Sequence, residues 1–401
     1  DFGTVFLGED IDFAGIQYWA LYARCEHNEQ PPDEKCFKIG RTWVSTDQEI
    51  EMHSPWGPWE DTSIVGLQDR IPDLRGNTGY KMNSVFFREG KASSCRMIVY
   101  QSPTWAQFPV DAALGLVDSV NLCDNYYSVT SNTQGPWEFP RFLKNDLLQK
   151  EPYGVALWIY HNYYRMLNTG IKLPVSGGSA YPGGGGGGPA GMNRFYVEIG
   201  DTFSPDNYFT NWKCGKTFAT NGPFLIAEVN GVRANKNDID NKKDKTQLFL
   251  RVVSNRPVKY LEWVADGNII DRKELTNLNT PQNEVWETEH DLRPYHWIAA
   301  RCFGESERTL FPKGGHISPP FLTAHTSPVY LKCFGKADSV KLEAVNNIIK
   351  HIDWMKEVIE GTRDSAFASG MFDFKLLNDN AKIDIFNILN KARKKYISGI
   401  T

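Results

Sequence analysis

The spacing of apolar residues changes twice along the chain. Up to about residue 172, short apolar runs over 4–8, 62–67, 95–101 and 116–122 are typical of buried strands, whereas 14–24 and 155–168 have helical spacing. From 193 to about 334, strand-like runs separated by Asn-Gly and Asp-Gly pairs predict an antiparallel β-sandwich of immunoglobulin-like type. Over 340–361 and 381–397 the spacing is helical again and predicts two amphipathic helices.

A run of six glycines, 183–188, stands between the helix-like segment and the first strand of the predicted sandwich. Glycine has large conformational freedom in the unfolded chain, so a folded protein keeps such a run where a loop moves or approaches a ligand closely. The run is a hinge-like linker or one wall of a site. It lacks the Lys-Ser/Thr ending of a phosphate-binding loop, so nucleotide binding has little support.

Length and charge narrow the classes of function. With 401 residues and 41% hydrophobic content, the chain can bury a large core and form two or three domains. The formal net charge of −4 and the scattered Lys and Arg residues argue against a nucleic-acid partner. No apolar run approaches the roughly 20 residues that span a bilayer. The chain does not begin with Met, so we expect a mature or truncated form.

Cysteine usage leaves the redox compartment open. The seven cysteines form no CxxC pair, which argues against a zinc ribbon. A disulfide could join Cys25 to Cys36 across a polar loop, and Cys302 and Cys333 lie in neighbouring strand-like runs. Buried free thiols are the favoured interpretation, because an odd count leaves at least one thiol unpaired.

Several phrases of the sequence occur together in order. They are WVSTDQEIE (43–51), YQSPTWAQFPVDAALGLVDSVNLCDN (100–125), YYRMLNTGIKLPVSGGSA (163–180), MNRFYVEIGDTFSPDNYFTNWKCGKTFATNGPFLIAEVNG (192–231) and AHTSPVYLKCFGK (324–336). Together they resemble the PHP-type metallohydrolases of the CehA/McbA (carbaryl hydrolase-like) group, especially its large, exported members. The resemblance runs from about residue 40 to the end of the chain.

The resemblance implies a distorted PHP-type β/α barrel over 1–191, a β-sandwich over 192–336 and a C-terminal helical segment over 337–401. It also implies a divalent metal, Zn, Mn or Fe, held by His, Asp and Glu at strand ends. A metal-bound hydroxide would then hydrolyse a phosphate ester, a carbamate or a related bond. Exported members of the group suggest a periplasmic or extracellular location, and a cytoplasmic location stays open as the alternative.

The chain departs from the group at four ligand phrases. No histidine stands in the first strand-like run, and Pro58 stands where a Gly-His pair would align. Tyr126 replaces the histidine of an Asn-Asn-His phrase, and Ala180 replaces the aspartate of a Gly-Ser/Thr-Asp phrase. Each change removes a possible ligand, and a divalent metal held by one or two side chains binds weakly. A degenerate site would hold no metal.

The remaining candidate ligands come from three segments. Glu49, Glu51 and His53 alternate, so on a strand they would share one face, although a solvated strand edge explains them more often. Asp124 could ligate a cation, or cap a turn. His161 lies among aromatic residues, where a histidine is more often structural than a ligand. The candidate metal ligands are thus Glu49, Glu51, His53, Asp124 and His161.

Other residues are candidates for binding an organic ligand. Asn125, Ser179 and Arg194 lie beside the predicted site or just after the glycine run, and a structural role is favoured for Arg194. Trp56, Trp59, Trp105 and Trp137 stand in loops and could stack on sugar rings or protein surfaces, although buried Trp is more frequent. His325 is expected to fix a contact between the barrel and the β-sandwich.

Two hypotheses remain. The first is a metal-dependent hydrolase of PHP type acting on a small molecule. The second is a catalytically inactive, PHP-derived scaffold that binds a carbohydrate or a protein partner in a larger assembly. The missing histidines favour the second, and the resemblance over most of the chain favours the first.

Overall fold

A computed structural model describes residues 2–21, 26–28, 33–51, 53–57, 60–75, 80–123, 147, 150, 152–179, 189–240, 242, 244–306, 321–333, 338–363, 372 and 374–399. The chain divides into two compact units. Unit 1 comprises residues 1–118, 136–144 and 343–401, and unit 2 comprises residues 119–135 and 145–342. Unit 1 is therefore built from both ends of the chain.

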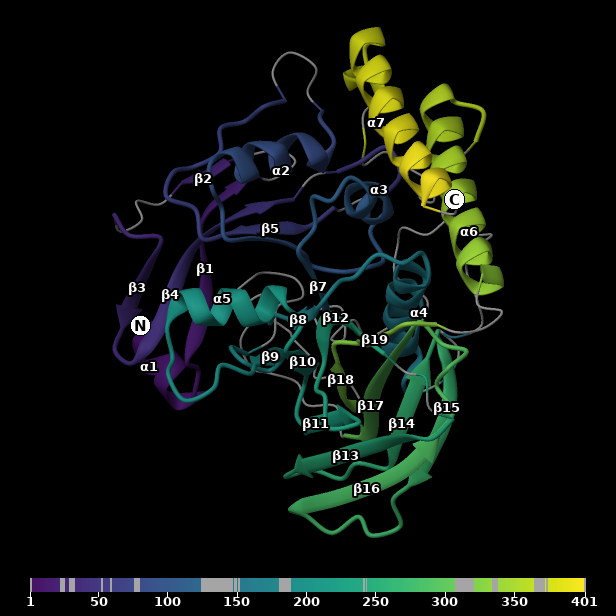
Figure 1. The fold of residues 1–401 in the computed structure, drawn as a ribbon. Helices are drawn as coiled ribbons and strands as arrows, with labels where there is room; N and C mark the ends of the chain where they lie inside the picture. Colours follow the sequence, from purple (N-terminus) through teal and green to yellow (C-terminus); the bar gives the residue numbers. More distant parts are fainter. Residues whose placement is uncertain are drawn as a thin grey trace. The chain divides into compact units, whose positions relative to one another are not determined.

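A curled, half-barrel sheet contains the strands of unit 1 (Figure 1). Its strands are β1 (Phe13–Leu21), β2 (Glu26–Asn28), β3 (Cys36–Ile39), β4 (Thr42–Ile50), β5 (Thr62–Val65) and β6 (Met97–Tyr100). They follow the order β2-β1-β4-β5-β6, and β3 pairs with β4. The β1–β4 pair is parallel, whereas β4–β5 and β5–β6 are antiparallel.

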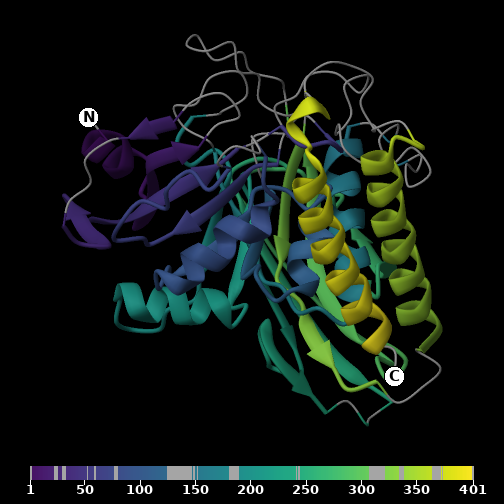
Figure 2. The same cartoon turned by 90° about the horizontal axis from the view of Figure 1, so that it is seen from above.

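Helices supply the rest of unit 1. They are α1 (Phe2–Gly8), α2 (Asn83–Ala92), α3 (Phe108–Ala113), α6 (Asp338–Glu360, in unit 1 from residue 343) and α7 (Asp379–Ser398), with a 3₁₀ turn at Phe374–Leu376. The Asn378 side chain caps α7 by accepting a hydrogen bond from the Ala381 amide at 2.9 Å. The two C-terminal helices lie side by side (Figure 2), and Arg393 bonds Asp353 between them at 3.2 Å.

Unit 2 begins with α/β elements. They are β7 (Ser119–Cys123), α4 (Gly154–Asn168), β8 (Val175–Gly177) and α5 (Pro205–Lys213), with β7 parallel to β8. The α4 helix is mostly buried, as its run of aromatic and aliphatic residues predicts. Ser204 caps α5 by accepting a hydrogen bond from the Asn207 amide at 3.1 Å, and Pro205 occupies the first helical position.

The rest of unit 2 consists of β-strands that share one apolar core. The strands are β9 (Arg194–Val197), β10 (Thr217–Thr220), β11 (Phe224–Val229), β12 (Asn235–Ile239), β13 (Thr246–Ser254), β14 (Tyr260–Ala265), β15 (Asn268–Glu274), β16 (Gln282–His290), β17 (Trp297–Glu305), β18 (Phe321–Thr326) and β19 (Val329–Leu331). One sheet has the order β12-β19-β17-β18-β10-β9, with β14 and β15 branching from β17, and the other is β11-β13-β16. Buried residues of both sheets pack into a single cluster, which is the arrangement of a sandwich.

Several sequence-based predictions are confirmed. The runs at 62–67, 95–101 and 116–122 form β5, β6 and β7, and 155–168 forms α4. The two helices predicted after residue 336 are α6 and α7. Asp266 and Gly267 both have positive φ, 47° and 86°, and connect β14 to β15 as the Asp-Gly pair predicts. A mixed α/β chain with a β-rich second part and C-terminal helices is thus correct at the coarse level.

Two predictions near the N-terminus are wrong. Residues 2–8 form α1 instead of a strand, and residues 13–21 form β1 instead of a helix. The β1 strand pairs in parallel with β4 from Phe13 to Leu21, with one register shift between Gln17 and Trp19. Because this pairing joins segments far apart in the chain, it overrides the local spacing of apolar residues.

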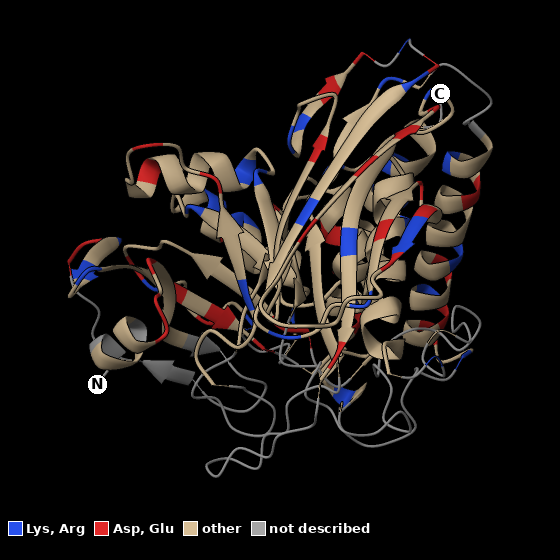
Figure 3. Cartoon of the chain, turned by 90° about the horizontal axis from the view of Figure 1, so that it is seen from below, with Lys and Arg blue, Asp and Glu red and all other residues tan. Residues whose placement is uncertain are grey.

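The surface of the described residues carries both signs of charge. Lys and Arg are interspersed with Asp and Glu along the helices and strands (Figure 3). None of the helices in the described part of the chain is long and apolar enough to cross a membrane.

Candidate functional site

Three aromatic rings form a partly exposed surface in unit 2. Tyr196 of β9 lies opposite Phe218 of β10 in the strand register, and their rings stack with centroids 4.9 Å apart at 13°. Phe224 of β11 meets both rings edge-on, with centroids 5.1 Å from Tyr196 and 4.9 Å from Phe218. Tyr196 is 39% exposed and Phe224 is 37% exposed, whereas Phe218 is buried. We name these three residues the aromatic shelf.

Charged side chains stand beside the aromatic shelf. Glu198 follows Tyr196 by two residues, and Glu228 follows Phe224 by four along β11, so both lie on the sides of their strands that carry the rings. Arg233 joins them, with N···O distances of 3.2 Å to Glu198 and 3.1 Å to Glu228. These three side chains are partly exposed. The β-strand segments that carry the rings thus also carry hydrogen-bond donors and acceptors, with Glu228 four residues, roughly 13 Å, along β11 from Phe224.

A tight turn between β10 and β11 places Phe224 on the shelf. The Thr220 hydroxyl donates to the Pro223 carbonyl at 2.7 Å and accepts from the Gly222 amide at 2.9 Å. The Asn221 side chain donates to the Phe321 carbonyl at 3.0 Å and accepts from the Thr323 amide at 2.7 Å. The phrase TFATNGPF thus supplies two rings of the shelf and the turn that holds them together.

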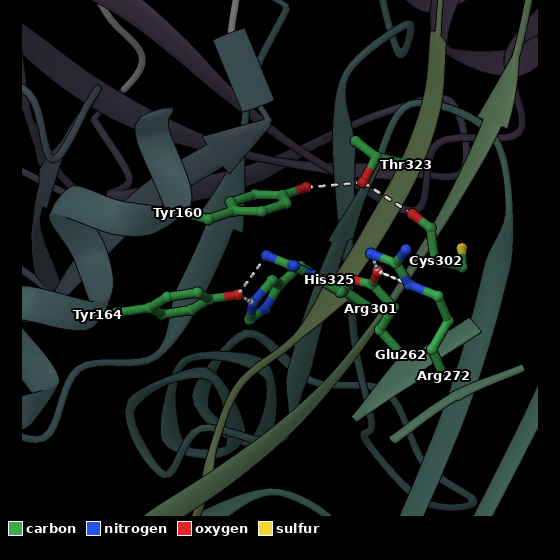
Figure 4. A network of polar contacts seen from close by, with 8 residues as sticks. All are labelled: Tyr160, Tyr164, Glu262, Arg272, Arg301, Cys302, Thr323 and His325. Carbon is green, nitrogen blue, oxygen red and sulfur yellow. Dashed lines mark hydrogen bonds and ion pairs between the residues drawn. The ribbon is translucent and has the colours of Figure 1, made fainter. Parts of the chain in front are cut away.

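A buried polar network connects α4 to the sheet of unit 2 (Figure 4). The Tyr164 hydroxyl lies 2.6 Å from His325 Nε2 and accepts a hydrogen bond from Arg301 at 3.3 Å. Arg301 Nε donates to Glu262 Oε2 at 2.6 Å, and Arg272 Nε donates to Glu262 Oε1 at 2.6 Å. Glu262, Arg301 and His325 are buried, so their polar atoms depend on one another for hydrogen bonds.

Burial keeps the tyrosine and the histidine of this network neutral near pH 7. It raises the pKa of Tyr164 to about 12, with the Arg301 cation opposing it, and lowers the pKa of His325 to about 3, helped by the same cation. Neither group is a proton donor or acceptor suited to neutral pH. His325 joins β18 to α4, in agreement with a structural role between the α/β part and the β-rich part.

The phrase YYRMLNTGIKLPVSGGS (163–179) is held by hydrogen bonds within itself and to the β-rich part of unit 2. The Tyr163 hydroxyl donates to the Leu173 carbonyl at 2.6 Å, and the Val175 amide donates to Ser327 Oγ at 2.9 Å. Asn168 accepts from the Trp297 indole at 2.7 Å. The bonds from Asn168 and Val175 to Trp297 and Ser327 therefore fix α4 and β8 on the β-rich part of unit 2.

Glu49, Glu51 and His53 follow one another at the end of β4 in unit 1. Glu49 lies on the strand, Glu51 and His53 lie just beyond it, and all three are half-buried. Gln101 Nε2 donates to Glu49 Oε1 at 2.7 Å. Burial, followed by the charge of Glu49, raises the pKa of Glu51 to about 7. The two carboxyl groups are thus close enough to influence each other.

The other predicted ligands belong to unit 2 or lie outside the described residues. His161 of α4 stacks on Trp158 at 6.4 Å, and burial lowers its pKa to about 4. Asp124 and Asn125 are outside the described residues, as is the glycine run 183–188. Among the residues that the structure describes, no three His, Cys, Asp or Glu side chains are grouped closely enough to hold a metal ion. The predicted metal site stays a prediction.

Ser179 and Arg194 make local contacts. Ser179 Oγ donates to the Asn193 carbonyl at 2.9 Å and accepts from the Asn193 amide at 3.0 Å. Arg194 Nε donates to the Gly191 carbonyl at 2.5 Å. These bonds tie the start of β9 to the residues before it, which is the structural role that we favour for Arg194.

The tryptophans and cysteines singled out in the sequence lie in buried positions or outside the described residues, or are free thiols. Trp56 and Trp105 are buried and present no stacking surface, and Trp59 and Trp137 lie outside the described residues. Cys302 and Cys333 are free thiols, in agreement with the favoured interpretation. Cys25 is outside the described residues. The aromatic shelf itself was not predicted, although its rings stand in the quoted phrases.

Comparisons with known proteins do not assign a family. No family model and no curated protein matches the chain. One solved structure, titled "pT26-6p", is similar at 11% identity over 46% of each chain with a TM-score of 0.19. A TM-score this low carries no argument about fold or function.

Proposed function

We propose that the protein is a carbohydrate-binding protein built on a PHP-derived fold, with the aromatic shelf as its ligand-contact surface. In this proposal the α/β part is a distorted PHP-type β/α barrel and the β-rich part is an immunoglobulin-like sandwich. The observation that carries the proposal is the partial exposure of Tyr196 and Phe224 beside the ion-paired Glu198, Glu228 and Arg233.

The chemistry of the shelf suits a sugar ring. The face of an aromatic ring has a negative quadrupole, so it attracts the weakly positive C–H groups on the flat side of a pyranose. Carboxylate and guanidinium groups at the edge can exchange bonds with one another for bonds to hydroxyl groups. Preformed ring contacts around Phe218 hold both exposed rings in place, which reduces the entropy lost on binding.

Binding of soluble oligosaccharides tests the proposal. The wild type is titrated by calorimetry against a panel of β- and α-linked glucose, galactose and N-acetylglucosamine oligomers. Tyr196→Ala and Phe224→Ala should each weaken binding of the preferred oligomer about tenfold, since one ring contact of this kind is worth about 1.4 kcal/mol. Phe374→Ala, at a 47% exposed ring in unit 1, is the matched control and should bind like the wild type.

Two outcomes of the oligosaccharide titration would contradict the proposal. If no oligomer of the panel binds to the wild type at millimolar concentration, the carbohydrate function is wrong. If an oligomer binds equally well to the two shelf variants and the control, the protein binds carbohydrate elsewhere. Circular dichroism of each variant ensures that lost binding is not lost folding.

Hydrolysis is the second candidate, and the Glu49–Glu51 pair favours it. A carboxyl group with a pKa near 7 beside a second carboxylate can serve as a general acid or base at neutral pH. The resemblance to PHP-type enzymes adds a divalent Zn, Mn or Fe ion, for which Glu49, Glu51 and His53 are the candidate ligands in unit 1. That ion would activate water for attack on an ester-like bond.

A metal assay separates the two candidates. Protein purified without chelator is analysed for Zn, Mn and Fe, and phosphodiester and carbamate model substrates are assayed with each metal. The hydrolase requires metal-dependent turnover that Glu51→Gln reduces by at least tenfold. Turnover that is absent in the wild type, or unchanged in Glu51→Gln, contradicts it.

A further inference from the structure

Two fully buried carboxyl groups lie in the interior of unit 1. Glu60 precedes β5, Asp111 lies on α3, and both have 0% exposure. Burial raises the pKa of Glu60, and the charge of Asp111 raises it further. Both carboxyl groups also act on the buried hydroxyls of Tyr80 and Tyr100. The four side chains therefore converge on one region.

Protein groups satisfy only part of this region. The backbone amide of Gln107 donates to Glu60 Oε2 at 3.2 Å, and the Ser54 hydroxyl donates to Glu60 Oε1 at 3.3 Å. The Tyr100 hydroxyl donates to Asp111 Oδ2. Asp111 Oδ1 has no hydrogen-bond partner among the described residues. An ionised carboxylate in the interior is strongly unfavourable unless a cation or further donors compensate it.

The first turn of α2 adds two more oxygen atoms that, like Asp111 Oδ1, are buried and have no hydrogen-bond partner among the described residues. Asn83 Nδ2 donates to the Glu60 carbonyl at 3.3 Å, which leaves Asn83 Oδ1 as the acceptor. Asn83 Oδ1 and Ser84 Oγ are buried and have no hydrogen-bond partner in the described part of the chain. The backbone amide of Asn83 donates to Gln107 Oε1 at 2.9 Å, so the start of α2 and the start of α3 are held together beside Glu60.

We propose that this region binds one hard divalent cation, Ca²⁺ or Mg²⁺, through Glu60, Asn83 and Asp111. Its donors are all oxygen atoms, two from carboxylates, which is the ligand type that these cations prefer. Two carboxylate charges would balance one divalent charge, and the Arg88 cation also acts on Asp111. The Gln107 Nε2 group, which also has no partner among the described residues, is a donor available to a water molecule on the cation. The site differs from the Glu49, Glu51 and His53 group in residues and in ligand chemistry.

Thermal unfolding with and without the cation tests the site. The wild type is treated with EDTA, dialysed into chelator-free buffer and heated with 0 or 5 mM CaCl₂ or MgCl₂. Saturation of a micromolar site at 5 mM cation should raise the Tm of unit 1 by roughly 10–20 °C. Tb³⁺ titration provides a second measurement, because Tyr100 is bonded to Asp111 and can sensitise luminescence of an ion held there.

Variants locate the ion. Glu60→Gln and Asp111→Asn should lose the Tm gain and the luminescence, while their Tm without cation should match or exceed that of the wild type, since each removes a buried carboxyl group. Asp47→Asn is the matched control, because Asp47 is also buried but its Oδ1 atom accepts from the Ser45 hydroxyl and the Gly66 backbone amide. This control should keep the full gain.

Two experimental outcomes would contradict the proposed cation site. A wild-type Tm that moves by less than about 1 °C with either cation, together with no Tb³⁺ luminescence, shows that the carboxyl pair shares a proton instead of a metal. A gain that persists in Asp111→Asn shows that the ion binds elsewhere. If both charge variants fail to fold, Asn83→Ala replaces them and should weaken Tb³⁺ binding; unchanged binding contradicts the site. The shelf in unit 2 contributes no residue here, so this test and the carbohydrate test fail independently.

Discussion

Removal of the Glu262 charge should destabilise unit 2 severely. Glu262 is 2% exposed at its side chain, and its two oxygen atoms accept from Arg301 and Arg272. In Glu262→Gln the Arg301 guanidinium, 6% exposed, keeps its charge but loses its counter-ion. Breaking a buried ion pair in this way costs about 3–5 kcal/mol. Arg272 is 51% exposed, so Arg272→Ala should cost about 1 kcal/mol or less.

Urea unfolding measures both variants. Tryptophan fluorescence and far-UV circular dichroism give the free energy of unfolding of each variant and of the wild type. The double variant Glu262→Leu with Arg301→Met is the decisive control, because replacing both members of a buried pair by apolar residues is often neutral or stabilising. The reasoning is refuted if Glu262→Gln costs no more than Arg272→Ala, or if the double variant is less stable than Glu262→Gln.

Three further changes have expected outcomes. Burial raises the pKa of Asp47 to about 8, so its contribution to stability is complete below pH 4 and is lost as pH rises to 8; the Tm of unit 1 should fall over that range, and less steeply in Asp47→Asn. A Cβ at Gly304 would lie 2.1 Å from a backbone oxygen, so Gly304→Ala should lower the Tm by several degrees, whereas Gly8→Ala, with open space, should not. Burial raises the pKa of Cys302 to about 12, so in iodoacetamide labelling followed by peptide mapping the exposed Cys214 should react in the native protein and Cys302 only after unfolding; equal labelling of both contradicts this.

Local sequence patterns predict the elements that local physics determines. The Asp266–Gly267 pair adopts two positive φ values, which few other residues tolerate, and so identifies the β14–β15 hairpin. The apolar stripe of α4 predicts a buried helix because its spacing matches the helical repeat. For β1 the local pattern predicts the wrong element, because parallel pairing with β4 outweighs its helix-like spacing.

The candidate sites depend on contacts that no spacing indicates. Tyr196 and Phe218 lie in adjacent strands, and only the β9–β10 register places their rings together. Glu60 and Asp111 come from a loop and a short helix, and each has an ordinary sequence context. The predicted group Glu49, Glu51 and His53 rests instead on alternation within one strand. Sequence reasoning therefore finds groups within an element more readily than groups between elements.

The division of unit 1 between the two ends of the chain has a consequence for biosynthesis. The Trp56 indole donates to the Met355 carbonyl at 2.8 Å across a separation of 299 residues. At about 5–20 residues per second, the ribosome makes Met355 roughly 15–60 s after Trp56. The described residues of unit 2 are all synthesised within that interval, between the two parts of unit 1. During translation the β1–β6 region is therefore made before α6 and α7. Until these helices emerge, the apolar surface that they cover in unit 1 is available to chaperones.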